Sequence, residues 1–224
     1  MMKKIFLLIM LFSFTFILGS ISMVNAEEEK RTAANSDTSA HKDQPSSNFG
    51  HLSPIFIVTS GSDSESNGYF HFGLGGKPDN LIKAEIDIRV NTVTNPMDIT
   101  VYLVNESWGE YTLTWDNKPA TGEVITTFMI NSVGHMHFDV SDHVAGGSLS
   151  ICIKANSNIQ NGFIAVDSRE TSSYVPLIIW TYETNVNNGE PTIAGYQLLS
   201  LLLGVLGMLL FLAHKWRNKF DHMQ

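Results

Sequence analysis

The segment 107–122, SWGEYTLTWDNKPATG, holds residue types that proteins use to bind sugars. Trp108 and Trp115 offer flat rings on which a sugar can stack, and Asp116 and Asn117 could bond its hydroxyl groups. The same residues can build architecture, because a tryptophan can fill a core and an Asp-Asn pair can close a turn. We predict a core position for Trp115, whereas the direction of Trp108 stays open because a glycine follows it.

The alternation inside this segment predicts a strand. Tyr111, Leu113 and Trp115 would share one face, and Thr112 and Thr114 would share the other. An Asp-Asn-Lys-Pro turn would then end that strand. The segment is therefore predicted to be mainly a strand with its corner.

A second chemically interesting motif is DSRE at 167–170. In an extended strand Asp167 and Arg169 would project to the same face. The guanidinium fork of Arg169 could bind a uronate carboxylate through two parallel hydrogen bonds. It could also pair with Asp167, Glu85 or Asp87 and pin two sheets together, and this structural pairing is the one we predict.

His135, His137 and Asp139 occupy alternate positions of one predicted strand, so their side chains would share a face. Two imidazoles and a carboxylate at this spacing could converge on a transition-metal ion. The simpler alternative is a solvated strand face, because the residues between them are apolar. A structural Ca²⁺ held by Asp139 and Asp142 is a further alternative.

No motif of a known catalytic machinery occurs: there is no Gly-x-Ser-x-Gly turn, no His-Glu-x-x-His helix and no phosphate-binding glycine loop. A pair of catalytic carboxylates stays open, because only the fold sets their separation. Cys152, the single cysteine, lies in an apolar run and is predicted to be unreactive, and no intramolecular disulfide can form. We therefore expect a protein that is not an enzyme.

The elements that must position these side chains are strands. Apolar and polar residues alternate over most of residues 48–182, most clearly at 83–90, where four apolar side chains share one face. Clusters of glycine, asparagine, aspartate and serine separate the runs. The pattern predicts an all-β fold, an antiparallel β-sandwich of jelly-roll type, with one C-terminal transmembrane helix.

The two ends of the chain predict membrane targeting. Residues 1–26 combine a basic start, an apolar run and small residues, the layout of a secretory signal peptide. Residues 193–213 carry no charge and as a helix would span roughly 31 Å, close to the hydrocarbon thickness of a bilayer. The basic tail 214–224 then places the C-terminus in the cytoplasm and the N-terminus outside. We expect a single-pass plasma-membrane protein whose anchor is similar to those of archaeal surface proteins and is retained rather than processed.

The polar segments on either side of the strands are predicted to be flexible. Residues 27–47 contain no large apolar side chain and read as a disordered leader, and residues 183–192 read as a short tether. The formal net charge of −8 argues against nucleic acid as a partner. Asn105 begins an Asn-Glu-Ser triplet and is a candidate glycosylation site.

Seven short motifs follow one another along residues 48–182. They are Asn48-Phe49-Gly50, Tyr69 to Leu74, Trp108-Gly109-Glu110, Thr114 to Pro119, Phe138 to Ser141, Ser168-Arg169-Glu170 and Pro176 to Tyr182. In type and order they resemble the motifs of DNRLRE-type domains, also described as disaggregatase-related domains and as family 96 carbohydrate-binding modules. The block from Trp108 to Pro119 is the specific part of this resemblance.

The resemblance implies a β-sandwich that binds polysaccharide and performs no chemistry. The candidate ligand-binding residues are Trp108, Asp116, Asn117, Arg169, Glu170 and His71. His71 stands where the family has an arginine and Gly73 where it has an aspartate. These two departures leave open whether the family's ligand site is kept.

Together these features predict a cell-surface protein whose ectodomain binds glycan non-catalytically. The alternative is a structural surface-coat or adhesion protein that contacts neighbouring surface proteins and has no affinity for sugar. An enzyme acting on polysaccharide is the weakest of the three interpretations.

Overall fold

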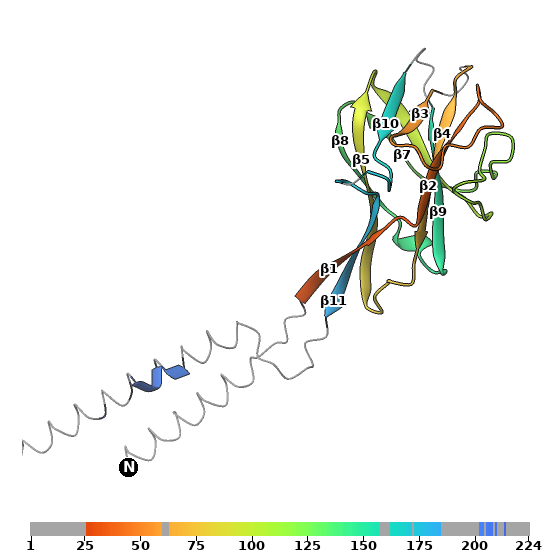
Figure 1. Cartoon of the computed structure of the whole chain (residues 1–224). Coiled ribbons are helices and arrows are strands. Elements are labelled where there is room, and N and C mark those ends of the chain that lie inside the picture. The colour runs from red at the N-terminus through yellow and green to blue at the C-terminus, as the bar shows by residue number, and fades with distance from the viewer. Residues whose placement is uncertain are drawn as a thin grey trace, which may run out of the picture. The chain divides into compact units, whose positions relative to one another are not determined.

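The computed structural model describes residues 26–59, 63–156, 162–171 and 173–184, together with seven residues between 202 and 213. Residues Glu27–Thr184 form one compact unit (Figure 1). The predicted signal peptide, and most of the predicted tether, anchor and tail, lie outside the described residues. In the part that is described, no helix combines the length and the apolar character needed to cross a bilayer.

The described residues of this unit form eleven strands and one short 3₁₀ helix (Figure 1). They are β1 (Ala26–Ala33), β2 (Ser36–His41), β3 (Ile55–Val58), β4 (Ser66–Gly73), β5 (Leu81–Val93), β6 (Met97–Leu103), β7 (Val124–Ile130), β8 (Gly134–Asp139), η1 (Ser141–His143), β9 (Ser148–Ala155), β10 (Phe163–Val166) and β11 (Leu177–Thr184).

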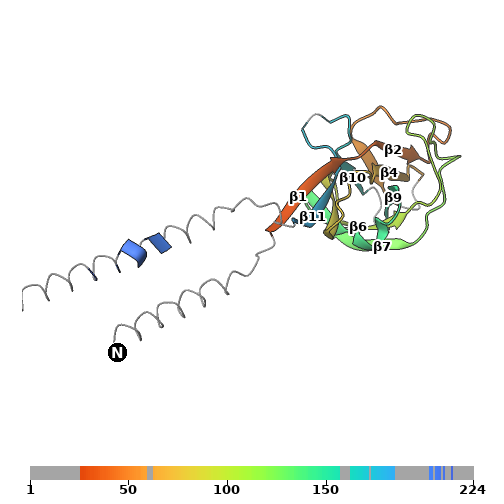
Figure 2. The same cartoon turned by 90° about the horizontal axis from the view of Figure 1, so that it is seen from below.

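The strands pair in the order β1-β11-β5-β10-β3-β4-β9-β6-β7, while β8 joins the other edge of β5 and β2 joins β4. Every pairing between strands whose register is defined is antiparallel. Seen from below, the strands curve round a common interior (Figure 2). The structure thus confirms the predicted all-β antiparallel class, in the form of one strongly curled sheet, a half-barrel.

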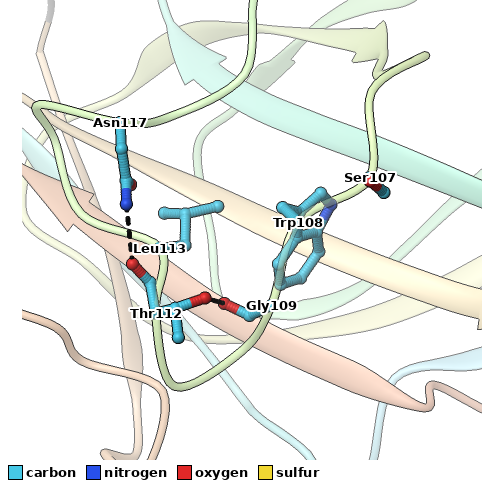
Figure 3. Close-up of a pocket in the computed structure, with 6 residues that line it drawn as sticks. All are labelled: Ser107, Trp108, Gly109, Thr112, Leu113 and Asn117. Atoms are coloured by element: carbon cyan, nitrogen blue, oxygen red, sulfur yellow. Dashed lines mark hydrogen bonds between the residues drawn. The ribbon is translucent and has the colours of Figure 1, made fainter.

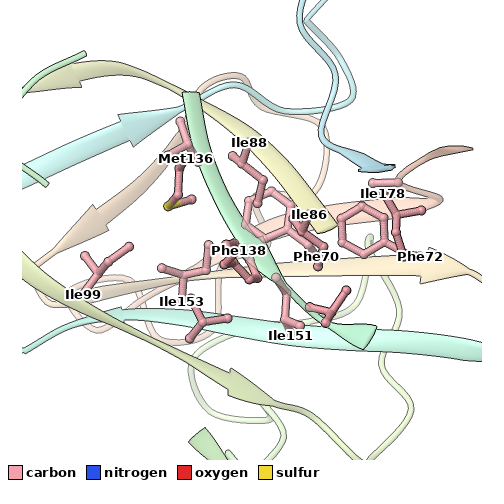
Figure 4. Packing of buried hydrophobic residues seen from close by; sticks show 14 of the residues in the cluster. Phe70, Phe72, Ile86, Ile88, Ile99, Met136, Phe138, Ile151, Ile153 and Ile178 are labelled. Atoms are coloured by element: carbon pink, nitrogen blue, oxygen red, sulfur yellow. The ribbon is translucent and has the colours of Figure 1, made fainter. Parts of the chain in front are cut away.

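The interior of this curled sheet is apolar (Figure 4). In β5, Ala84, Ile86, Ile88 and Val90 are buried, as the alternation at 83–90 predicts. They pack with side chains of the same kind from β4, β8, β9 and β11, including Phe70, Phe72, Met136, Phe138, Ile151, Ile153, Ile178 and Trp180. Each such large side chain contributes about 1.5–3 kcal/mol when it leaves water. Packing therefore holds the unit together without a disulfide, and Cys152 is a free, buried thiol.

The prediction that residues 27–47 form a disordered leader is wrong, because β1 and β2 lie in this range. The whole of β2 pairs with β4, from Ser36 opposite His71 to His41 opposite Ser66. Residues 37–40 of β2 are all buried. Disorder is predicted for this segment because it lacks large apolar side chains. β2 is nevertheless ordered, because neighbouring residues bury it and its backbone pairs with β4. At the other end, β11 continues to Thr184, into the predicted tether.

The prediction of a strand at 111–115 is also wrong. The connection 104–123 between β6 and β7, here called the site loop, contains no strand. The amides of Thr112 and Leu113 both donate to the carbonyl of Gly109, which makes a turn. Leu113 is consequently buried while Tyr111 is 63% exposed, so these two side chains do not share a face.

Candidate functional site

The site loop is held by the chain that precedes β3. The side-chain nitrogen Nδ2 of Asn48 donates to the carbonyl oxygens of Glu110, at 2.8 Å, and Leu113, at 2.7 Å. Gly50 packs so closely that a Cβ added there would lie 2.1 Å from the Glu110 carbonyl oxygen. The two outer residues of the Asn48-Phe49-Gly50 motif therefore have a positioning role, since they clamp the backbone of the loop.

Further along the loop, Asn117 acts as an internal brace. Its Oδ1 accepts from the Thr114 amide at 2.7 Å, and its Nδ2 donates to the Thr112 carbonyl at 2.9 Å. Lys118 Nζ lies 3.6 Å from the centre of the Trp115 ring and donates to the Trp115 carbonyl oxygen. Trp115 is half-buried against a small cluster that includes Leu113, and the lysine occupies one face of its ring.

Trp108 lies in a pocket of about 300 Å³ that the site loop forms (Figure 3). The lining residues are Ser107, Trp108, Gly109, Thr112, Leu113 and Asn117. Among the described residues, the indole Nε1 of Trp108 is buried and has no hydrogen-bond partner. An unpaired buried N–H costs free energy, so a ligand group that reached this nitrogen would supply a missing bond. These six residues are called the Trp108 pocket below.

His71 and Tyr69 of β4 support the Trp108 ring. Their rings meet it edge-on, with centroids 6.3 Å and 6.0 Å from the indole. His71 Nδ1 lies 2.7 Å from Ser150 Oγ on the neighbouring strand β9. Burial lowers the pKa of His71 from its ordinary value, which favours the neutral ring. His71 therefore packs behind the tryptophan as an uncharged group.

Arg169 lies in a group of carboxylates beside the site loop. Its Nη1 donates to Glu110 Oε2 at 3.0 Å and to the carbonyl oxygen of Asn35. Its backbone amide donates to Asp37 Oδ2 at 2.7 Å, and its Nε lies 3.9 Å from Glu170 Oε1. Arg169 therefore has structural partners, as predicted, although they differ from the three acids that the sequence suggested. Asp37, Glu110, Glu170 and Arg169 are called the carboxylate cluster below.

The motif around Arg169 is not an extended strand. β10 ends at Val166, and Asp167 turns to other partners, accepting from Arg89 Nη1 at 3.2 Å and from Asn91 Nδ2 at 2.6 Å. The predicted arrangement, with Asp167 and Arg169 on one face of a strand, is therefore wrong. Two separate ion pairs follow β10: Asp167 pairs with Arg89 of β5, and Arg169 pairs with Glu110 of the site loop.

Asp37 is the most deeply buried acid of the carboxylate cluster, at 1% exposure. Asp37 Oδ1 has no hydrogen-bond partner among the described residues, whereas the backbone amide of Asp37 donates to Glu110 Oε1. Burial raises the pKa of Asp37 to about 7, and the charges of Glu170 and Glu110 add to this against the opposing effect of Arg169. The cluster thus joins β2, the site loop and the segment that follows β10, and it contains one acid, Asp37, whose pKa is raised.

These contacts account for the positions of several of the motifs noted in the sequence. The model of carbohydrate-binding module family 96 matches residues 28–182, well over half of the 224-residue chain. The chain belongs to this family. The family match begins within β1, which agrees with the compact unit rather than with a domain that starts at residue 48. Among curated proteins, none matches this chain.

The candidate ligand residues of this family 96 domain fall into separate groups. Trp108 and Asn117 line the Trp108 pocket. Arg169 and Glu170 lie in the carboxylate cluster, joined to the loop by Glu110. Asp116 lies apart, where its Oδ2 accepts from Ser46 Oγ at 2.9 Å.

The candidate glycosylation residue Asn105 has an exposed side chain at the start of the site loop. It lies beside Gly122, at the other end of the loop.

The structure brings together a different set of potential metal ligands from the set that the sequence suggested. His135 and His137 of β8 lie next to Asp87 of β5, and the ligand atoms of these three residues all lie within 4.8 Å of one another. Asp139 Oδ1 instead accepts from the Ser141 amide at 2.8 Å, and hydrogen bonds from Ser141, first from its side chain and then from this amide, lower the pKa of Asp139. Asp142 lies in η1 and belongs to neither of the two clusters of potential metal ligands in the described residues.

Sequence reasoning missed Asp37 and Asp87, each for its own reason. Asp37 lies in a segment that the sequence predicts to be disordered. Asp87 is predicted only as a possible partner of Arg169, yet it is buried beside the two histidines. The β5–β8 register, which places Asp87 opposite His137, is a long-range feature. A family motif was the signal available for Glu110, because it follows Trp108 and Gly109.

Proposed function

We propose that this family 96 domain binds polysaccharide without catalysis and that the Trp108 pocket receives one sugar unit. The observation that carries the proposal is the pocket with polar walls beside the Trp108 ring, whose indole N–H has no partner among the described residues. A sugar presents hydroxyl oxygens that accept such a bond and a weakly polar face that packs on an aromatic ring. Family membership supports the same ligand class.

The size and lining of the pocket favour a small ligand group. A volume of about 300 Å³ is at the lower end of the range of ligand pockets, which suits a single residue or chain end of a glycan. Ser107 and Thr112 add hydroxyl groups beside the indole N–H. Both polar atoms of the Asn117 side chain already bond the backbone of the loop, so we propose that Asn117 fixes the shape of the pocket.

Recognition is proposed to rest on shape and hydrogen bonding more than on charge. Arg169, the cation that could have bound a uronate, already donates to Glu110 and Asn35. The chain carries a formal net charge of −8, which disfavours polyanions. We therefore expect neutral glycans to bind better than uronate-rich ones.

The acids of the carboxylate cluster support a non-catalytic role. Asp37 and Glu110 are 1% and 7% exposed, and neither lines the Trp108 pocket. A glycosidic bond held in that pocket would therefore be out of reach of these two carboxyl groups, whereas glycoside hydrolysis requires carboxyl groups on both sides of the bond.

We also propose that the domain is displayed at the cell surface by a single C-terminal span, as the sequence of residues 193–213 suggests. The basic residues that follow favour a cytoplasmic C-terminus. For the fold, we propose that the curled sheet is a variant of the jelly-roll sandwich, because β8-β5 and β4-β9 contribute side chains to one shared core.

The test is glycan binding by the full chain in mild detergent, first on a glycan array and then by calorimetry with the best ligand. Trp108→Phe keeps a ring but removes the N–H, and we expect it to weaken binding about fivefold, as the loss of one hydrogen bond worth about 1 kcal/mol predicts. Trp108→Ala should remove most of the affinity. Trp115→Phe, outside the pocket, is the matched control and should bind like wild type.

Equal binding by all three variants would overturn the assignment of the pocket. Absence of binding to any glycan, with cross-links to neighbouring surface proteins on cells, would favour the structural coat protein instead.

A further inference from the structure

The outer face of β5 and β8 carries a group of side chains that the glycan site does not use. Asp87 lies on β5, and His135 and His137 lie on β8. The antiparallel register places Asp87 directly opposite His137, while His135 is opposite Arg89. Ile88, Met136 and Phe138, which alternate with these residues along the two strands, are buried in the core. Asp87, His135 and His137 therefore lie on the opposite face of the sheet. Asp87, His135 and His137 are called the histidine face below.

One carboxylate oxygen is the focus of this face. His135 Nδ1 lies 2.8 Å from Asp87 Oδ1, and His137 Nε2 lies 3.7 Å from the same oxygen. The two imidazole rings stack at 5.9 Å with an interplanar angle of 22°. His135 Nδ1 and His137 Nε2 thus both lie near Asp87 Oδ1. Because β5 and β8 are hydrogen-bonded to each other, rotation of the side chains alone could bring the three atoms into a ligand geometry.

We propose that Asp87, His135 and His137 bind Zn²⁺. Zinc takes imidazole nitrogen and carboxylate oxygen at about 2.0–2.2 Å, so ligand atoms of a tetrahedral site lie about 3.4 Å apart. The observed separations of 2.8 and 3.7 Å lie on either side of that value. Three protein ligands leave a fourth position for water or another oxygen ligand.

The surrounding charges favour a cation at this face. Asp87 is buried, and its Oδ1 faces only the two imidazoles among the ion pairs of the described residues. The nearby Arg89 has other partners, because its guanidinium pairs with Asp167 and lies 4.3 Å from the centre of the Tyr174 ring. The Tyr174 ring in turn meets His135 edge-on at 5.9 Å and limits the movement of that imidazole.

The carboxylate cluster is a weaker metal site, although Asp37, Glu110 and Glu170 are also close together. There the guanidinium of Arg169 already lies between the acids and repels a second cation. Among the described residues, no lysine or arginine forms an ion pair with Asp87. Its nitrogen ligands also select zinc over the oxygen-preferring Ca²⁺ and Mg²⁺.

The experiment is calorimetric titration of the full chain with ZnCl₂, after chelator treatment and without a polyhistidine tag. We expect one site per chain in the wild type. His137→Gln is the chosen variant, because His137 lacks the short bond to Asp87 that His135 makes. We expect it to weaken binding at least 10–100-fold, the loss caused even by removing an outer-shell partner. His143→Gln, which lies in η1 outside the group, should bind like wild type.

A second readout separates ligation from folding. Co²⁺ in place of Zn²⁺ should give visible ligand-field absorption in the wild type that His137→Gln loses, while circular dichroism of the two proteins stays the same. Zn²⁺ should also raise the midpoint of thermal unfolding of the wild type alone. Stoichiometric zinc binding that His137→Gln and Asp87→Asn leave unchanged, or no zinc binding at all, would overturn the proposal. Neither result would bear on glycan binding by the Trp108 pocket.

Discussion

At the scale of single residues, Asp37 makes stability depend on pH. Its pKa is 3.8 in the unfolded chain and about 7 in the folded one, mainly because of burial, so folding favours the protonated form. This contribution to stability is complete below about pH 4 and is lost as the pH rises through 7. The change is at most about 4 kcal/mol, since one pKa unit corresponds to about 1.4 kcal/mol.

The measurement is the free energy of unfolding by urea at several values between pH 4 and pH 8. Asp37→Asn keeps the acceptor for the Arg169 amide and carries no charge, so we expect its stability relative to the wild type to increase as the pH rises. Asp116→Asn changes an exposed carboxylate and serves as the control, with a curve parallel to that of the wild type. A constant difference between Asp37→Asn and wild type would contradict this account of Asp37.

At the scale of elements, β2 is predicted to be part of the folded unit and not an appendage. Ala40 is fully buried in β2, whereas Ala33 at the end of β1 is exposed. Ala40→Asp would place a charge beside Tyr69 and Leu113 and should lower the free energy of unfolding by roughly 3 kcal/mol or more. Ala33→Asp should stay within about 0.5 kcal/mol of wild type. Urea unfolding followed by circular dichroism distinguishes the two; equal stabilities would mean that the segment is a free leader after all.

The same elements show which parts of the structure the sequence could predict. The period-two pattern of β5 is a local signal with a local cause, and its buried face is as predicted. β2 has no such signal, because its burial comes from β4, which lies about thirty residues away along the chain. The site loop mimics a strand in its alternation, yet the clamp from Asn48 fixes it as a turn. Long-range contacts therefore decide the cases in which periodicity fails.

At the scale of the whole molecule, the fold depends on a main apolar core and a smaller apolar cluster, with no covalent cross-link in the described residues. Cys152 lies in β9, between β4 and β6, and is fully buried. Burial raises the pKa of its thiol to about 12, so the reactive thiolate is scarce as well as inaccessible. Its side chain belongs to the smaller cluster with Ala40, Tyr69, Val104 and Leu113, so reaction of this thiol requires that cluster to open.

We predict that labelling of Cys152 by a thiol reagent reports global unfolding of the sheet. Because a domain of this kind is stable by about 5 kcal/mol or more, labelling of the native protein should be at least about 10³-fold slower than in urea. Ser148→Cys in a Cys152→Ala background places the thiol at the exposed start of the same strand and should label rapidly at all urea concentrations. The rate at Cys152 should rise with urea in proportion to the unfolding constant. A rate independent of urea would show that the small cluster over Cys152 opens locally, and labelling would then not report unfolding of the sheet.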